Sequence, residues 1–332
     1  MRRRLSLDEY ERGVRGADRA TLARAITLIE SHRDADAVLA QDLLARLLPH
    51  TGGARRIGIT GVPGVGKSTF TDAFGMMLCE RGHRVAVLAI DPSSTLSGGS
   101  ILGDKTRMAR LSVDPRAYIR PSPSGASPGG IARRTRETML LCEAAGFDVI
   151  LVETVGVGQG ETAVAAMVDF FLVLALPGSG DELQGIKKGV LELADAIAVN
   201  KADGDGKTRA RHALSDLKAA FRYLPPKRKS WRTRAVTTSG ITGDGLEDLW
   251  TIIEEHRAIL EKSGELTELR AEQQCAWMWS LIRERLEHAF RAHPAVAAEL
   301  ADTEHAVRTG AMNATAAASR LLAAFANTVH PA

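Results

Sequence analysis

The sequence predicts an α/β fold with a mainly parallel β-sheet and with helical extensions at both ends of the chain. First, short apolar runs alternate with helical segments from Arg55 onward, which is the pattern of a parallel sheet covered on both faces. Second, the parts before Arg55 and after about Gly264 have helical spacing and no strand pattern. Third, the 332 residues are 45% hydrophobic, enough to bury a large core and carry extensions.

Three parts are expected along the chain. Residues 1–53 form an N-terminal helical extension, in which two helical patterns end at a proline and a glycine pair. Residues 54–263 form the central domain, with strands expected at "RRIGIT", "RVAVLAI", "FDVILVE", "DFFLVLAL" and "DAIAVN". Residues 264–332 form a C-terminal extension, in which "CAWMWSLIRERLEHAF" and "NATAAASRLLAAFANTV" have helical spacing.

Charge and composition narrow the class of protein. The 43 basic and 40 acidic side chains leave a net charge of +3, which gives no electrostatic argument for nucleic acid or a membrane surface. The longest nearly apolar stretch, residues 163–176, is interrupted by Asp169 and is shorter than the ~18 residues of a spanning helix. The three cysteines stand apart from one another, which suits a reducing compartment and offers no evident metal site. We expect a cytoplasmic protein without nucleic-acid or membrane partners.

The stretch "GVPGVGKST" matches the phosphate-binding pattern GxxxxGK[ST] between an expected strand and an expected helix. Glycines let the backbone turn its N–H groups toward phosphates, and the helix N-terminus adds positive potential. Lys67 is expected to reach the β- and γ-phosphates, and Ser68 to bind Mg²⁺. The alternative, a glycine-rich turn without a ligand, does not require this order of strand, loop and helix. The predicted phosphate-binding residues are Gly61, Val62, Pro63, Gly64, Val65, Gly66, Lys67, Ser68 and Thr69.

The stretch "NKAD", residues 200–203, selects the base. A carboxylate at Asp203 can accept hydrogen bonds from the ring N–H and the exocyclic amine of guanine, whereas adenine presents a lone pair and no such amine there. Lys201 is expected to lie along the base plane and Asn200 to brace the loop. Backbone N–H groups of Ser239, Gly240 and Ile241, in "TTSGITG", are expected to close over the base. The nucleotide is therefore predicted to be GTP or GDP; alone, this short motif would be compatible with a polar turn.

Carboxylates at strand ends indicate where a cation would bind. Glu153 ends an expected strand and, with Lys67, is assigned to the catalytic machinery. Asp91 and Asp104 flank a glycine-rich loop, and a hard cation such as Mg²⁺ accepts one or two such carboxylates directly or through water. Alternatively, Asp91 is a turn residue before a proline and Asp104 is a helix N-cap.

Val157 follows Gly156 at the position where Ras-like GTPases have the glutamine that orients the attacking water. Gln159 is close by, but its spacing is wrong for that role. Hydrolysis is therefore predicted to be slow until a partner stimulates it.

The segment "LPGSGDELQGIKKG", residues 176–189, is expected to lie near the nucleotide because it follows a strand. Its three glycines lower the cost of backbone rearrangement, and its polar groups can form alternative pairs as the γ-phosphate comes and goes. A solvated strand-to-helix turn is the simpler alternative. The predicted switch residues are Asp181, Glu182, Gln184, Lys187 and Lys188.

Together, "GVPGVGKST", "AIDPSS", "GDKTRM", "ILVETVGVGQGE", "LPGSGDELQGIKKG" and "NKAD" resemble the MeaB/ArgK group of P-loop GTPases, over roughly residues 20–330. The resemblance implies a G-protein chaperone that couples GTP hydrolysis to adenosylcobalamin loading and protection of methylmalonyl-CoA mutase. It also implies that residues 176–189 communicate with the mutase as an additional switch loop. Finally, it implies a homodimer formed through the C-terminal helices, and Mg²⁺ ligands at Ser68, Asp91, Asp104 and Glu153.

Three other functions are weighed. A nickel chaperone of the same GTPase class would require a Cys/His cluster, which the sequence lacks. A kinase, which the older naming of ArgK relatives suggests, would require a base beside a phosphate acceptor, and the sequence does not distinguish such a base from the Mg²⁺ carboxylates. Nucleic-acid binding could use "KRKSWRTR", residues 227–234, although one basic run in a nearly neutral chain is more often a solvated loop.

An apolar stripe in the C-terminal extension also predicts dimerisation, independently of the resemblance. Packing of the stripe on the chain's own central domain is the alternative. The residues at helical spacing are Cys275, Met278, Trp279, Ile282, Leu286 and Phe290.

Overall fold

The computed structural model consists of two compact units, Met1–Gln273 and Gln274–Ala332. The division lies beyond the expected boundary at Gly264. No helix in the described part of the chain is both long and apolar enough to cross a membrane. The structure describes residues 3–31, 33–91, 107–123, 128–154, 160–177, 188–223 and 226–326.

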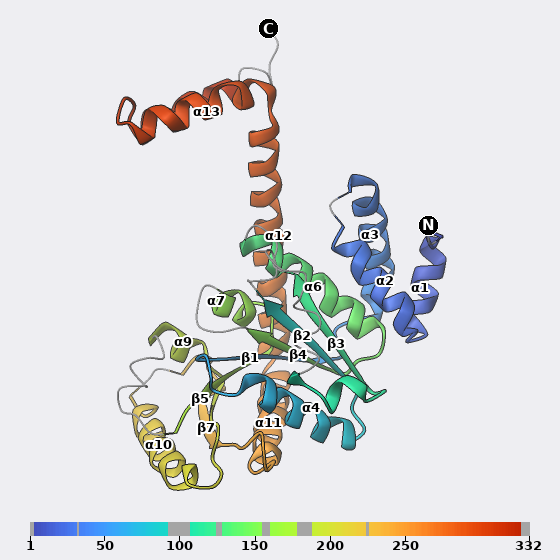
Figure 1. Cartoon of the computed structure of the whole chain (residues 1–332), viewed down its shortest axis with the longest axis vertical. Helices are drawn as coiled ribbons and strands as arrows, with labels where there is room; N and C mark the ends of the chain where they lie inside the picture. The colour runs from blue at the N-terminus through green and yellow to red at the C-terminus, as the bar shows by residue number, and fades with distance from the viewer. Residues whose placement is uncertain are drawn as a thin grey trace. The chain divides into compact units, whose positions relative to one another are not determined.

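The first unit is built around a seven-stranded sheet in which all neighbouring strands run parallel (Figure 1). The strand order is β3-β2-β4-β1-β5-β6-β7, so β1 lies between β4 and β5. The carboxyl ends of the strands therefore meet along one edge, where ligands bind in folds of this kind. The strands are β1 Arg55–Gly61, β2 Val85–Asp91, β3 Ala117–Pro123, β4 Val149–Thr154, β5 Phe170–Ala175, β6 Ala196–Val199 and β7 Arg234–Thr237.

Helices cover both faces of the sheet, which confirms the predicted fold class. On one face, α4 (Lys67–Glu80) and α11 (Leu246–Ser263) contribute Phe74 and Trp250 to a core shared with Ile57. On the other face, α7 (Gly160–Ala165) lies close to β1, since a Cβ at Gly58 would lie 2.8 Å from Val164 Cγ1. The other helices among the described residues of this domain are α6 Pro128–Ala144, α9 Lys188–Leu193 and α10 Gly206–Ala220.

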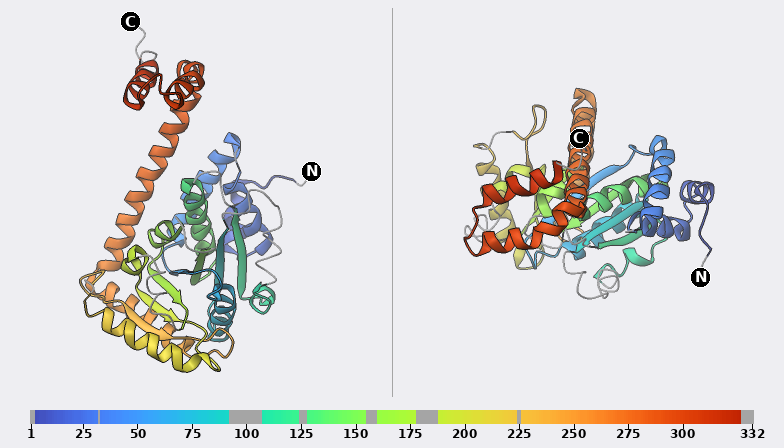
Figure 2. Two further views of the ribbon diagram at one scale, coloured as in Figure 1. Left: turned by 60° about the vertical axis from the view of Figure 1, so that its left-hand side comes forward. Right: turned by 90° about the horizontal axis from the view of Figure 1, so that it is seen from above.

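The N-terminal extension contains three helices, α1 (Leu7–Arg15), α2 (Arg19–Ile29) and α3 (Asp34–Leu47), which pack together beside α6 (Figures 1 and 2). The periodicity of residues 18–48 predicts α2 and α3 but not α1. A reciprocal cap starts α1: Ser6 Oγ accepts from the Glu9 backbone N–H at 3.3 Å, and the Ser6 N–H donates to Glu9 Oε2 at 2.7 Å.

Two parallel strands, β3 and β7, have no clear sequence signal. β3 contains two prolines, Pro121 and Pro123, in what looks like a loop; it forms an edge of the sheet, where missing N–H donors are tolerated. β7 has four residues and only one fully buried position, Val236, so it lacks an apolar run. Both strands pair with β2 or β6, which the sequence does identify.

Helix α12 (Glu265–Ala292) begins in the first unit, and its first turns are fixed there by polar contacts. Arg270 Nη2 donates to Asp169 Oδ2 at 2.7 Å and to the Ala54 carbonyl at 2.9 Å. Gln273 Nε2 donates to the Val168 carbonyl at 2.8 Å. The start of this helix is therefore part of the unit that carries the sheet.

The second unit consists of the rest of α12, α13 (Pro294–Arg308) and α14 (Ala314–Ala326). Helices α13 and α14 lie side by side (Figure 2). The Phe325 ring lies 5.4 Å from the Phe290 ring and 5.1 Å from the His293 ring, measured between centroids. Arg320 on α14 donates to Glu299 on α13 at 2.7 Å.

The basic segment 227–234 is anchored to the first unit through Trp231, while Lys229, Arg232 and Arg234 remain exposed. Trp231 is 2% exposed, and its Nε1 donates to the Asp195 carbonyl at 3.0 Å. Lys227 Nζ pairs with Asp195 Oδ2 at 2.7 Å, and the Arg234 guanidinium lies 4.6 Å from the Trp231 ring centroid. The tryptophan is therefore not free to stack on a nucleic-acid base, which removes the aromatic half of the nucleic-acid hypothesis.

His256 is buried next to this segment. Its ring lies 5.1 Å from Phe170 and 4.8 Å from Trp231 between centroids, and its Nε2 lies 3.7 Å from Asp195 Oδ1. Burial lowers the pKa of His256 to about 4; the Lys227 ammonium acts in the same direction, and the Asp195 carboxylate opposes both.

We expect His256 to make the fold less stable in mild acid. Between the ordinary histidine pKa of 6.5 and about 4, the unfolded chain binds a proton that the folded chain does not, so the free energy of unfolding falls as pH falls. Between about pH 7 and pH 5, the wild type should lose about 2 kcal/mol more than His256→Phe. Urea unfolding of both proteins at several pH values measures this difference; parallel pH profiles would contradict the assignment.

Candidate nucleotide-binding site

The loop between β1 and α4 has the backbone of a phosphate cradle. Gly66 precedes α4 at φ 92°, a conformation that L side chains rarely adopt. At Gly61 a side chain is excluded by contact, because a Cβ there would lie 2.6 Å from the Leu174 carbonyl oxygen of β5. The glycines of "GVPGVGKST" are thus required by the fold of the loop itself, and the N-terminus of α4 follows it directly.

A cavity of about 580 Å³ opens beside this loop, at the carboxyl ends of β2 and β4. Its lining combines backbone of the loop with one lysine, one arginine and one carboxylate. The lining residues are Pro63, Gly64, Gly66, Lys67, Ser68, Thr69, Ala89, Arg107, Glu153 and Thr154.

Lys67 lies folded back onto the loop. Its Nζ donates to the Gly61 carbonyl at 2.8 Å and to the Val62 carbonyl at 3.3 Å. Burial lowers the pKa of Lys67, and the carboxylates of Glu153 and Glu161 oppose that shift. The ammonium is held beside the loop by neutral carbonyls, so a phosphate oxygen can replace them without breaking an ion pair to the loop.

Glu153 meets α4 from the end of β4. It is 6% exposed, and its two oxygens accept from Ser68 Oγ at 3.0 Å and from Thr71 Oγ1 at 2.9 Å. The parallel register sets Glu153 opposite Ile59 and Ala89 on the two neighbouring strands. Sheet topology therefore brings together Ser68 and Glu153, which lie far apart in the sequence and are both predicted here as Mg²⁺ ligands.

The other predicted cation ligands are less fully described. The backbone of Asp91 ends β2 next to β4, since Ile90 is in register with Thr154. Asp104 lies outside the described residues, as does the side chain of Asp91. Within the described part of the chain, three or more His, Cys, Asp or Glu side chains do not gather at any point into a group that could hold a metal.

The base-recognition motif is linked to the phosphate loop by two side chains. Asn200 Nδ2 donates to the Val65 carbonyl at 2.9 Å, and Lys201 Nζ donates to the Gly64 carbonyl at 2.7 Å. Lys201 has φ 58°, so the chain turns sharply directly after β6. Asn200 therefore ties the end of β6 to the phosphate loop.

Asp203 is joined to the loop after β7. Ser239 Oγ donates to Asp203 Oδ2 and accepts from the backbone N–H groups of Ile241 at 3.2 Å and Thr242 at 3.1 Å. The Ser239 N–H donates to the Asp244 carbonyl at 2.9 Å. Two of the backbone donors predicted to close over the base, those of Ser239 and Ile241, are thus engaged within the loop.

Gly240 brings the same loop against α4. A Cβ at Gly240 would lie 3.0 Å from the backbone nitrogen of Phe70, so a larger residue would push the loop away from the phosphate helix. The Ile241 side chain is 77% exposed. The base and phosphate ends of the site are therefore fixed to each other through α4 as well as through Asn200.

Sequence reasoning missed two charged residues of the site, Arg107 and Glu161. Arg107 lines the cavity, and "GDKTRM" was the only signal for it. Glu161 is 3% exposed in the first turn of α7, and its charge acts on Lys67. A buried acid in a polar stretch such as "GVGQGET" cannot be recognised without the packing around it.

Several predicted residues lie outside the described part of the chain. They are Val157 and Gln159 near the expected water position, the predicted switch residues Asp181, Glu182, Gln184 and Lys187, and the side chain of Lys188. The backbone of Lys188 begins α9.

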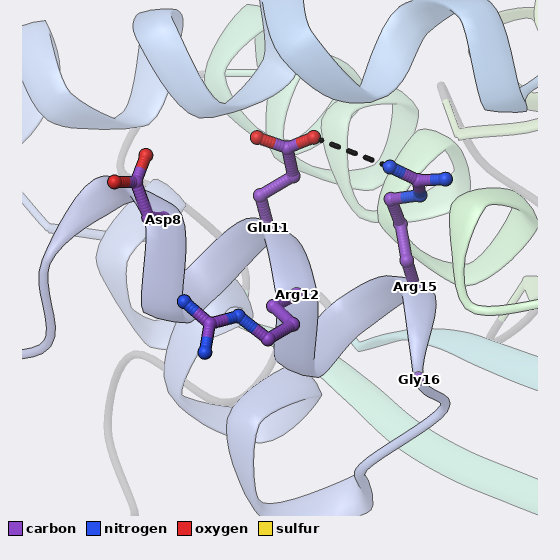
Figure 3. Close-up of a pocket in the computed structure, with 5 residues that line it drawn as sticks. All are labelled: Asp8, Glu11, Arg12, Arg15 and Gly16. Carbon is purple, nitrogen blue, oxygen red and sulfur yellow. Dashed lines mark hydrogen bonds and ion pairs between the residues drawn. The ribbon is translucent and has the colours of Figure 1, made fainter.

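A second hollow, of about 500 Å³, lies on α1 and is unrelated to the nucleotide site (Figure 3). Its charged lining groups largely satisfy one another. Arg15 pairs with Glu11 at 3.5 Å, and Arg46 of α3 pairs with both Asp8 and Glu11. These contacts join α1 to α3.

The comparisons with known proteins identify the family of this chain. A family model described as "Methylmalonyl Co-A mutase-associated GTPase MeaB" matches residues 22–295. The chain belongs to the MeaB family. It is therefore a GTPase.

Relatives cover nearly the whole chain. A "Putative GTPase" of Caulobacter vibrioides is 58% identical over 321 residues, covering 97% of this chain and 98% of the relative. "GTPase ArgK" of Escherichia coli is 48% identical and covers 86% of each chain. A crystal structure titled "LAO/AO transport system kinase" has a TM-score of 0.77 at 38% identity, covering 97% of this chain and 98% of that one. The fold of this MeaB-family chain, helical extensions included, thus has a solved counterpart.

Proposed function

We propose that this chain is a cytoplasmic G-protein chaperone that couples Mg²⁺-dependent GTP hydrolysis to adenosylcobalamin loading and protection of methylmalonyl-CoA mutase. The observation that carries the proposal is the candidate nucleotide site in a chain of the mutase-associated family. In this site Lys67 Nζ donates to the Gly61 carbonyl, Ser68 Oγ donates to Glu153, and Ser239 Oγ donates to Asp203. Turnover is proposed to be slow for the chaperone alone and faster with the mutase, because the sequence has Val157 where Ras-like GTPases have the glutamine that orients the attacking water.

The donor atoms suit a magnesium ion. Mg²⁺ prefers hard oxygen ligands and is usually held by one or two carboxylates together with phosphates and water. The Ser68 hydroxyl and the Glu153 carboxylate provide such oxygens next to the phosphate loop. Asp91 and Asp104 are proposed to complete the set. The ion would neutralise phosphate charge, while Ser68 and Glu153 orient it.

The polar loop at residues 176–189 is proposed to connect nucleotide state to the mutase. It follows β5, whose neighbour β1 leads into the phosphate loop. The charged groups of this loop would bias one conformation over another without touching the reacting phosphate.

Replacing Asp181 or Lys187 with alanine should leave basal GTP turnover within about twofold while removing most of its stimulation by the mutase. The measurement is GTP turnover with and without methylmalonyl-CoA mutase, alongside nucleotide-gated transfer of adenosylcobalamin to it. Lys218→Ala, an exposed change on α10, serves as the matched control. Parallel loss of basal and stimulated turnover would assign the loop to catalysis, and unchanged stimulation would remove its coupling role.

A homodimer is proposed through the second unit. Its helices leave large apolar side chains exposed: Trp279 by 57%, Leu286 by 60% and Leu322 by 59%. Such an apolar surface is typical of a protein interface.

Introducing negative charge into this apolar surface tests the dimer in the full chain. Trp279→Glu with Leu286→Glu should convert the dimer to a monomer in analytical ultracentrifugation, because both carboxylates would lose water in the interface. Arg285→Glu, an exposed change on the same helix, should stay dimeric. A dimer that persists in the double variant would place the interface elsewhere.

A kinase is the second candidate, because the solved counterpart is titled a kinase. Radiolabelled GTP separates the two functions. The GTPase proposal expects the γ-phosphate as free inorganic phosphate, whereas a kinase would leave it on an amino acid or on protein.

A further inference from the structure

We propose that Arg107 is a catalytic residue of this GTPase, contacting the terminal phosphate of bound GTP and stabilising the charge that develops there. This role rests on the proposed function in one respect, because the reaction that Arg107 would accelerate is the proposed Mg²⁺-dependent hydrolysis of GTP. Arg107 lines the phosphate cavity together with Lys67 and Ser68. The Arg107 side chain is exposed.

The residues directly after Arg107 are anchored to the phosphate helix. Met108 is fully buried in the core shared with α4. Asp72 of α4 accepts from Arg110 Nε at 2.9 Å and from the Leu111 backbone N–H, also at 2.9 Å. The backbone that carries Arg107 is therefore tied to the same helix that carries Lys67.

A glycine in α4 lets the segment after Arg107 pack closely on this helix. Leu111, at the start of the short 3-10 helix η3 (Leu111–Val113), lies against Gly75, where a Cβ would be only 2.5 Å from Leu111 Cδ2. Glycine inside a helix costs about 1 kcal/mol relative to alanine, so its presence here is explained by the close packing of Leu111. The packing of Leu111 on Gly75 therefore fixes the backbone from which the Arg107 side chain enters the cavity.

The charge balance of the cavity requires a second cation. Lys67 and Arg107 are the cationic residues of the described lining, and Glu153 is its carboxylate. A Mg²⁺-bound triphosphate carries about two negative charges and Glu153 adds a third, so Arg107 would offset charge that Lys67 alone leaves uncompensated. Guanidinium presents paired N–H donors that match two phosphate oxygens, which a lysine does not.

The proposed contribution is electrostatic. The attacking water oxygen bonds to the γ-phosphorus while the bond from that phosphorus to the β–γ bridging oxygen breaks. The bridging oxygen leaves with the electron pair on GDP, and the proton from water is released to solvent. Arg107 N–H groups would hold the charge that accumulates on the γ-phosphate oxygens as the phosphoryl group moves, as a cis arginine does in other GTPases.

Arg107→Ala tests the proposal with two readouts. Single-turnover GTP hydrolysis should fall on the order of 100-fold, and added guanidinium ion should restore part of it, because the cation itself is what is missing. Affinity for a non-hydrolysable GTP analogue should fall about tenfold while affinity for GDP stays within twofold, since only the terminal phosphate loses a contact. Arg81→Ala, at the far end of α4, is the matched control and should retain both properties.

The outcomes are distinguishable from those of the proposed function. Unchanged hydrolysis in Arg107→Ala, or equal losses of GDP and GTP-analogue affinity, would overturn the role of Arg107 whatever the wild type does. If the wild type does not hydrolyse GTP, the proposed function fails, yet a selective loss of GTP-analogue affinity would still support the contact. Far-UV circular dichroism of each variant verifies that the fold is retained.

Discussion

Lys67→Ala is expected to reduce GTP hydrolysis on the order of 1,000-fold, the largest catalytic effect of any single change in this chain. The Lys67 ammonium is fixed within hydrogen-bond distance of the Gly61 carbonyl, at the position where the loop would cradle phosphates. A fixed cation stabilises the transferred charge without reorganising during the reaction, whereas water that fills the space of the lost side chain must reorient.

Single-turnover rates at saturating GTP, measured for Lys67→Ala and the wild type, provide the check. Lys262→Ala, an exposed change near the end of α11, controls for the loss of a positive charge. A Lys67→Ala rate within tenfold of the wild type would show that another group supplies the main phosphate charge. Arg107 would then be the first to examine.

Asp203→Asn is expected to lower GTP affinity at least about 100-fold and to create affinity for xanthosine triphosphate. The Asp203 carboxylate is proposed to accept two hydrogen bonds from guanine. In asparagine an N–H donor replaces one of these acceptors, and this donor would face the N–H donor of the guanine amine. Xanthine has a carbonyl at that position, which the amide can donate to. Because Ser239 Oγ donates to Asp203, the oxygen of an asparagine can keep this contact, so the loop geometry should survive.

Direct titration of GTP, ATP and xanthosine triphosphate into each protein, by isothermal calorimetry, measures the exchange of specificity. Asp205→Asn, two residues along at the start of α10 and without a capping hydrogen bond, is the matched control. Equal affinity of the wild type for ATP and GTP would show that Asp203 does not select the base. So would an Asp203→Asn protein that still prefers GTP over xanthosine triphosphate.

Local sequence identified the parts of the site that depend on backbone geometry. The glycines of "GVPGVGKST" are needed because of the turn between β1 and α4, and "NKAD" follows a strand end at which Lys201 has positive φ. Such constraints act within a few residues, so they are readable as short motifs. The apolar runs that predict β1, β2, β4, β5 and β6 are readable for the same reason, since strands buried on both faces have continuous apolar sequence.

The sequence by itself therefore determined the α/β class and the glycine loop between β1 and α4, whereas the tertiary structure decided which distant side chains meet. Glu153 reaches Ser68 because β4 lies next to β1. Arg107 reaches the cavity because Leu111 packs into the notch at Gly75. Trp231 became a core residue, despite its basic neighbours, because β6 and α11 enclose it. The physical reason is that periodicity and turn chemistry report on the nearest neighbours along the chain, while strand order and side-chain packing bring together residues from different elements.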